Sequence, residues 1–83
     1  MRKNAKINYK GAEISYSIYG GEESNLYSGD GGIFLYFGSC VDEIQINTPE
    51  PCVSAEEFEE NLVANAKEQI DTLISSGEII PKI

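Results

Sequence analysis

The feature that most constrains the fold is a long amphipathic helix, which the sequence predicts over residues 54–76. Ser54 and Glu57 have the spacing of a capping box, in which each residue satisfies a backbone N–H of the other. Apolar residues recur at helical spacing for about six turns, and Gly77 follows where a C-terminal glycine belongs. The apolar stripe consists of Phe58, Leu62, Val63, Ala66, Ile70, Leu73 and Ile74. One face of this helix therefore needs a covering layer.

Short strands are the natural covering layer, and the sequence predicts them at residues 6–10, 13–19, 33–37 and 43–47. The first two alternate in polarity, and Gly11-Ala12 between them suggests a type II′ hairpin turn. Residues 33–37 are apolar on both faces, as in a central strand, and Pro49 and Pro51 end the sheet. The 83 residues suit a single domain, 1–83. We expect an α+β fold: a four-stranded antiparallel meander with one C-terminal helix on one face (ββββα).

Residues 20–32 interrupt this pattern and read as a long glycine-rich loop. Five of the thirteen residues are glycine and three are acidic, and the apolar residues follow neither strand nor helix periodicity. Leu26 and Tyr27 lie in the middle with no predicted strand to place them. Two interpretations are open: the two side chains anchor a partner protein, or the loop folds back so that they cover the sheet edge.

Charge is the strongest functional signal. Six basic residues stand against fourteen acidic ones, for a net charge of −8, and four of the six basic residues lie in the first ten positions. An acidic body repels nucleic acid and anionic membranes and attracts basic proteins, including proteins that bind nucleic acid. We therefore expect a basic protein partner, no direct nucleic-acid binding and no membrane association. The alternative is that the acidity serves solubility alone.

Acidic residues crowd the predicted start of the helix. Carboxylates there are stabilised by the helix dipole, and they are also available to a basic partner as an acidic edge. The candidate protein-binding residues are Glu56, Glu57, Glu59, Glu60, Asp42 and Glu43, with Leu26 and Tyr27 as apolar anchors.

Aromatic residues give a second candidate surface. If the helix covers the isoleucine-rich face of the sheet, then Tyr19, Phe34 and Tyr36 lie on the open face. Such a face favours self-association into a homodimer, although aromatic side chains are also ordinary strand residues.

Several chemistries are excluded or disfavoured. The chain has no histidine, which removes a Ser-His-Asp triad and an imidazole zinc site. The loop lacks the lysine of a P-loop, and Asp30 lacks the acidic neighbours of a calcium loop. We predict no catalytic residue, metal site or cofactor. Without a signal peptide or a membrane-spanning run we expect a cytoplasmic protein, with Cys40 and Cys52 as free thiols.

In size and charge the chain resembles the small acidic proteins of phages and mobile elements that block host defence enzymes. The resemblance implies a non-enzymatic inhibitor or adaptor, which would cover the ligand site of a nucleic-acid-handling complex with its carboxylates. Two alternatives remain: an immunity or antitoxin protein against a basic nuclease toxin, and a structural, self-associating module.

Overall fold

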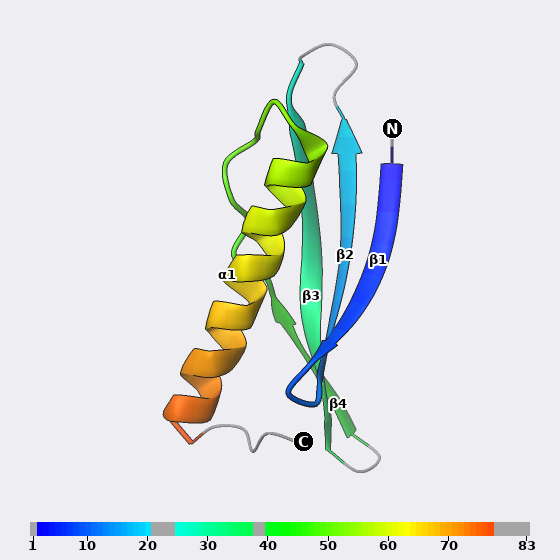
Figure 1. The fold of residues 1–83 in the computed structure, drawn as a ribbon. Coiled ribbons are helices and arrows are strands. Elements are labelled where there is room, and N and C mark those ends of the chain that lie inside the picture. The colour runs from blue at the N-terminus through cyan, green and yellow to red at the C-terminus, as the bar shows by residue number, and fades with distance from the viewer. Residues whose placement is uncertain (1, 21–24, 38–39, 78–83) are drawn as a thin grey trace.

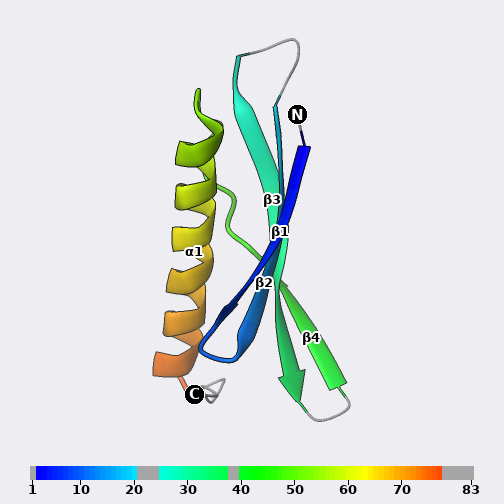
Figure 2. The ribbon, with the colours of Figure 1, turned by 45° about the vertical axis from the view of Figure 1, so that its right-hand side comes forward.

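The computed structural model describes residues 2–20, 25–37 and 40–77, and shows two layers (Figures 1 and 2). Among these residues, four antiparallel strands form one sheet in the order β1-β2-β3-β4, and one helix, α1, lies across one face. The predicted ββββα fold is confirmed. The elements are β1 (Arg2–Tyr9), β2 (Ala12–Gly20), β3 (Tyr27–Phe37), β4 (Cys40–Gln45) and α1 (Ala55–Ser75).

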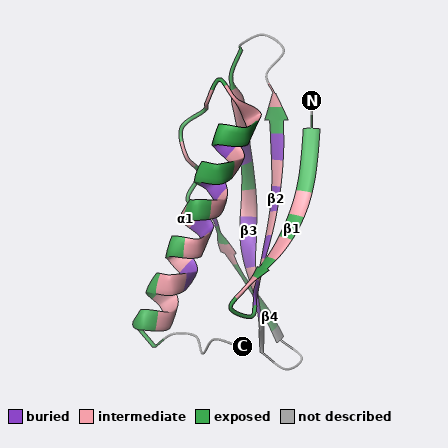
Figure 3. Cartoon of the chain, viewed as in Figure 1, coloured by how far each residue is buried: buried purple, intermediate pink, exposed green. Residues whose placement is uncertain are grey.

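The core lies between α1 and the two central strands. Every second residue of β2, from Ala12 to Ile18, faces the helix and is buried, because successive side chains of a strand point to opposite faces. The predicted stripe of α1 supplies the other half, and Figure 3 shows its buried positions turned toward the sheet. The fully buried side chains of greatest volume are Phe58, Ile14, Ile18, Ile33, Ile46, Leu62 and Ile70.

The hairpin turn differs from the predicted one by one residue. Tyr9 pairs with Ala12, so the connection is Lys10-Gly11 rather than Gly11-Ala12. Both turn residues have positive φ, 52° at Lys10 and 87° at Gly11. That combination belongs to a type I′ turn, whose twist also matches the flanking strands.

The predicted loop over 20–32 is wrong for its second half, because β3 already begins at Tyr27. The glycines there permit close packing. A Cβ on Gly29 would lie 2.1 Å from the Ser17 carbonyl oxygen and 3.1 Å from Cε1 of Phe58. A Cβ on Gly31 would lie 2.5 Å from the carbonyl oxygen of Ser15. These residues are glycine because β2 and the helix approach β3 too closely for a side chain.

The other strand boundaries shift by a few residues. β1 begins at Arg2 rather than at residue 6, and β4 covers Cys40–Gln45 rather than 43–47. Ile46 is still buried as expected, and its N–H donates to the Gly31 carbonyl at 3.0 Å.

The two cysteines occupy opposite ends of β3. Cys52 forms an isolated bridge with Tyr27, where β3 begins, and Cys40 pairs with Phe37, where it ends. Ten residues of strand span about 33 Å. A disulfide tolerates a Cα separation of at most about 7 Å. The backbone therefore excludes a bond between them, and Cys52 is a free thiol as predicted.

We expect Gly29→Ala to lower the free energy of unfolding by about 1–3 kcal/mol, because the added methyl group must displace the Ser17 backbone or the Phe58 ring. Urea denaturation measures the change. Ser28→Ala, one residue earlier in β3, is the control and should change stability by less than about 0.5 kcal/mol. Equal stability of both variants would show that this close approach does not exist.

Candidate protein-binding surface

The basic N-terminal strand is fastened to the helix by ion pairs. Lys3 Nζ lies 3.0 Å from a carboxylate oxygen of Glu59, and Lys10 Nζ lies 2.7 Å from one of Asp71. Lys6 faces Glu13 of β2 at 3.9 Å. The N-terminal lysines therefore neutralise acids of their own chain. Exposed pairs of this kind contribute little stability each, but they determine which carboxylates remain open to a partner.

Glu59 is fixed on the flank of α1 that faces the sheet. The Tyr16 hydroxyl donates to it at 2.6 Å, and Lys3 donates at 3.0 Å. These two hydrogen bonds, that of Tyr16 first, lower the pKa of the Glu59 carboxyl. Burial, followed by the same hydrogen bond, raises the pKa of Tyr16 to about 12. Glu59 was predicted with its neighbours as one binding surface, but the structure engages its oxygens within the fold.

Asp71 holds the other end of the helix in a similar way. Its carboxylate accepts from the Tyr9 hydroxyl at 3.0 and 3.1 Å and from Lys10. The hydrogen bond from Lys10 is the largest cause that lowers the pKa of Asp71. Lys67 lies 5.3 Å from the centre of the Tyr9 ring, within cation–π range. Side chains near both ends of α1 are thus hydrogen-bonded to the β1–β2 hairpin.

The outer face of α1 carries three of the remaining acids, which we call the outer acidic row: Glu56, Glu60 and Glu68. All three are exposed, and their spacing by multiples of four residues places them on one ridge that winds gradually around the helix. Glu57 is exposed beside the row. Within the described part of the chain, none of these four carboxylates forms an ion pair.

Asp42 and Glu43 do not join this row. Both lie in β4, near the C-terminal end of the helix, where Gln69 donates to the Gln45 carbonyl at 3.1 Å. Glu56 precedes Gln69 by about 20 Å of helix. Glu43 also borders Gly32 on the sheet face that lacks the helix. The acidic edge predicted from sequence is therefore two separate groups.

The two predicted apolar anchors have different environments. Tyr27 packs against the core, and its ring covers Gly20, where a Cβ would lie 2.8 Å from Tyr27 Cε1. Leu26 remains exposed, with 41% of its surface accessible. The structure adds Val53, exposed to 72%, which the sequence analysis did not select. The sequence carries no signal for this exposure, because an apolar residue just before the N-cap Ser54 usually packs on the helix.

The aromatic residues of the open face do not form one patch among the described side chains. Tyr19 is exposed and Phe34 half-buried, and both lie on the face opposite α1. Phe34 pairs with Glu13, six residues before Tyr19 on β2, which corresponds to about 20 Å along the strand. Serines and Asp30 occupy the space between, and the Tyr36 side chain lies outside the described part of the structure.

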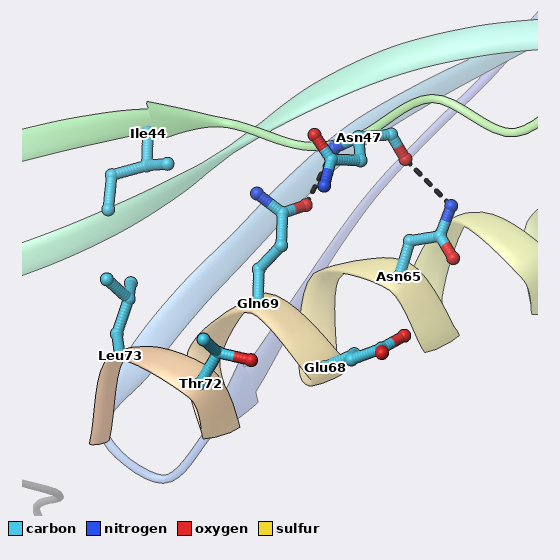
Figure 4. A pocket seen from close by; sticks show the side chains of 7 residues that line it. All are labelled: Ile44, Asn47, Asn65, Glu68, Gln69, Thr72 and Leu73. Carbon is cyan, nitrogen blue, oxygen red and sulfur yellow. Dashed lines mark hydrogen bonds between the residues drawn. The ribbon is translucent and has the colours of Figure 1, made fainter. Parts of the chain in front are cut away.

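A cleft of about 400 Å³ lies between α1 and the segment after β4 (Figure 4). Two side-chain amides of α1 hold that segment in place. Asn65 donates to the Asn47 carbonyl at 2.8 Å, and the Gln69 side chain accepts from the Asn47 N–H at 2.6 Å. These amides bind backbone. The cleft is lined by Ile44, Asn47, Asn65, Glu68, Gln69, Thr72 and Leu73.

Neither a metal-binding cluster nor a membrane-spanning helix is found among the described residues. They contain no cluster of three or more histidine, cysteine or acidic side chains arranged to hold a metal ion. In the same residues, no helix has the length and apolar character to cross a bilayer.

Comparisons with known proteins found no matching family, no similar curated protein and no similar solved structure.

We expect Glu59→Gln to lower the free energy of unfolding by about 1–2 kcal/mol, because a charged acceptor of two hydrogen bonds becomes neutral. Glu60→Gln removes the same charge from the outer face and should change stability by less than about 0.5 kcal/mol. Thermal or urea unfolding of the pair measures the difference. Equal effects would contradict a structural role for Glu59.

Tyr16 should govern stability at alkaline pH. Between pH 10 and pH 12 the unfolded chain releases this proton while the folded chain retains it, so stability falls as pH rises. In Tyr16→Phe this contribution is absent, and the decline over that interval should be shallower. Urea unfolding across the interval measures both slopes, and an unchanged slope in the variant would contradict the assignment.

Proposed function

We propose that this protein is a small non-enzymatic binding protein whose outer acidic row docks on a basic surface of another protein. The observation that supports the proposal most directly is the division of the acids on α1. Glu59 and Asp71 are matched by lysines of the chain, whereas Glu56, Glu60 and Glu68 face outward without a cation among the described residues. A basic partner would supply the missing countercharge.

The charge pattern favours a protein partner over a nucleic acid. Binding of phosphates needs clustered lysine or arginine, and the described N-terminal lysines are engaged with acids of their own chain. A row of carboxylates suits the opposite role. Lysine and arginine side chains that normally hold phosphates also bind carboxylates, so such a row can occupy a nucleic-acid site on a partner.

Inhibition of a nucleic-acid-handling protein is therefore our preferred role, as the resemblance to small acidic phage proteins also implies. An immunity protein against a basic nuclease would use the same surface, and the identity of the captured partner distinguishes the two. Self-association through the aromatic face has less support, because Tyr19 and Phe34 lie far apart on that face.

The test is capture of a partner from a bacterial lysate, followed by binding of the purified partner at increasing salt. We expect one basic protein, released as salt rises. The triple variant Glu56→Lys, Glu60→Lys, Glu68→Lys should lose binding by about a hundredfold or more, since each lost charge pair contributes about a factor of five.

The matched control is Asp30→Lys, Asp42→Lys, Glu43→Lys, which changes net charge equally but on the sheet. It should retain most of the affinity. Equal losses in both triple variants would show that overall charge, not the outer acidic row, drives binding. Capture of no basic protein at low salt would contradict the proposed function itself.

A further inference from the structure

Two apolar side chains lie exposed at the end of the sheet where α1 begins. Leu26 is 41% exposed and Val53 is 72% exposed. An isolated antiparallel bridge brings them together: the Tyr27 N–H donates to the Cys52 carbonyl at 2.6 Å, and the Cys52 N–H donates to the Tyr27 carbonyl at 3.0 Å. Leu26 and Val53 are the chain neighbours of the two bridged residues, so the bridge brings them to the same end of the sheet. We call these two residues the apolar end pair.

The core of the protein makes little use of this pair. Val53 precedes the N-cap Ser54, the position from which an apolar side chain usually packs onto the fourth helical residue. That residue is Phe58, which is fully buried and lies against Gly29 instead. Tyr27 and Cys52, the residues that form the bridge, pack against the core, while their neighbours Leu26 and Val53 stay exposed.

Three carboxylates lie close to the apolar end pair along the chain, and we call them the framing acids. Glu50, Glu56 and Glu57 lie within four residues of Val53, and all three are exposed. A second copy of the chain docking through the same surface would bring these carboxylates against their equivalents, which disfavours a symmetric dimer. A segment with apolar side chains beside lysine or arginine has the complementary chemistry.

We infer that the apolar end pair is the contact point for a basic segment of the partner protein, with leucine-like side chains against Leu26 and Val53 and lysine or arginine against the framing acids. The inference rests on the proposed function and adds the apolar part of the interface. Charge steers the approach, and desolvation of the apolar pair slows dissociation.

Two synthetic peptides of equal length and charge separate these contributions: one alternates lysine with leucine, and the other alternates lysine with serine. We expect the intact protein to bind the lysine–leucine peptide about tenfold more tightly, because burial of one or two aliphatic side chains contributes that factor. Fluorescence anisotropy measures affinity. Amide chemical shifts should change around residues 25–27 and 50–57.

The variant Leu26→Ser with Val53→Ser should bind both peptides equally, at the level of the lysine–serine peptide. Val41→Ser is the matched control, because Val41 is exposed to 53% in β4, away from the apolar end pair. It should keep the tenfold preference. Since all three side chains are exposed, both variants should unfold at nearly the temperature of the parent protein.

The outcomes separate the inference from the proposed function. Salt-sensitive binding of both peptides with equal affinity would overturn the inference and leave the proposed function standing. Shift changes centred elsewhere, or equal loss in the Val41 control, would also overturn it. Binding of neither peptide, together with the absence of a captured basic protein, would overturn both. A dimer that Leu26→Ser with Val53→Ser abolishes would assign the pair to self-association instead.

Discussion

The close approach of α1 to β3 is the contact on which the rest of the structure depends. The helix must bury its whole apolar stripe on a narrow sheet. The ring of Phe58, which is fully buried, packs directly against the backbone of Gly29. In so small a domain the core has few members, so each of these contacts is a large part of the total. The direction of the helix, and with it the outward aim of its acids, follows from this contact.

The electrostatic organisation follows from the same geometry. Because α1 lies over β2 and β3, its flanks reach the N-terminal hairpin, where the basic residues of the sequence are concentrated. Lys3 and Lys10 neutralise the acids on that flank. The acids on the outer face lie too far around the helix for the same lysines. The segregation of charge along the sequence thus becomes a segregation of charge in space.

Local patterns in the sequence predicted the fold, and tertiary packing explains where they did not suffice. The helix from its Ser54 cap and the alternating strand β2 are local features, and both formed as predicted. The glycines of residues 27–32 have the composition of a loop, yet they lie in a strand because β2 and Phe58 leave no room for side chains. That requirement depends on residues distant in sequence.

The candidate site shows the same division between features that local sequence patterns predict and features that depend on tertiary packing. Exposure of Glu56 and Glu60 follows from helical periodicity, but the engagement of Glu59 depends on where Tyr16 and Lys3 lie in the sheet. Val53 was missed because its sequence position predicts a buried staple. Phe58, the residue on which Val53 would pack, is buried against Gly29 instead, and Val53 stays exposed.

The size of the protein sets a further condition on how it binds. A stable interface covers about 800 Å² of each partner. The accessible surface of this chain is 5459 Å², so such an interface occupies a substantial part of one side. The outer acidic row alone would give contacts that salt screens readily. Extending the same interface past the helix N-terminus to Leu26 and Val53 adds apolar area that salt does not screen. In the binding role proposed here, charge would guide a partner during approach, and desolvation of the apolar pair would slow its dissociation.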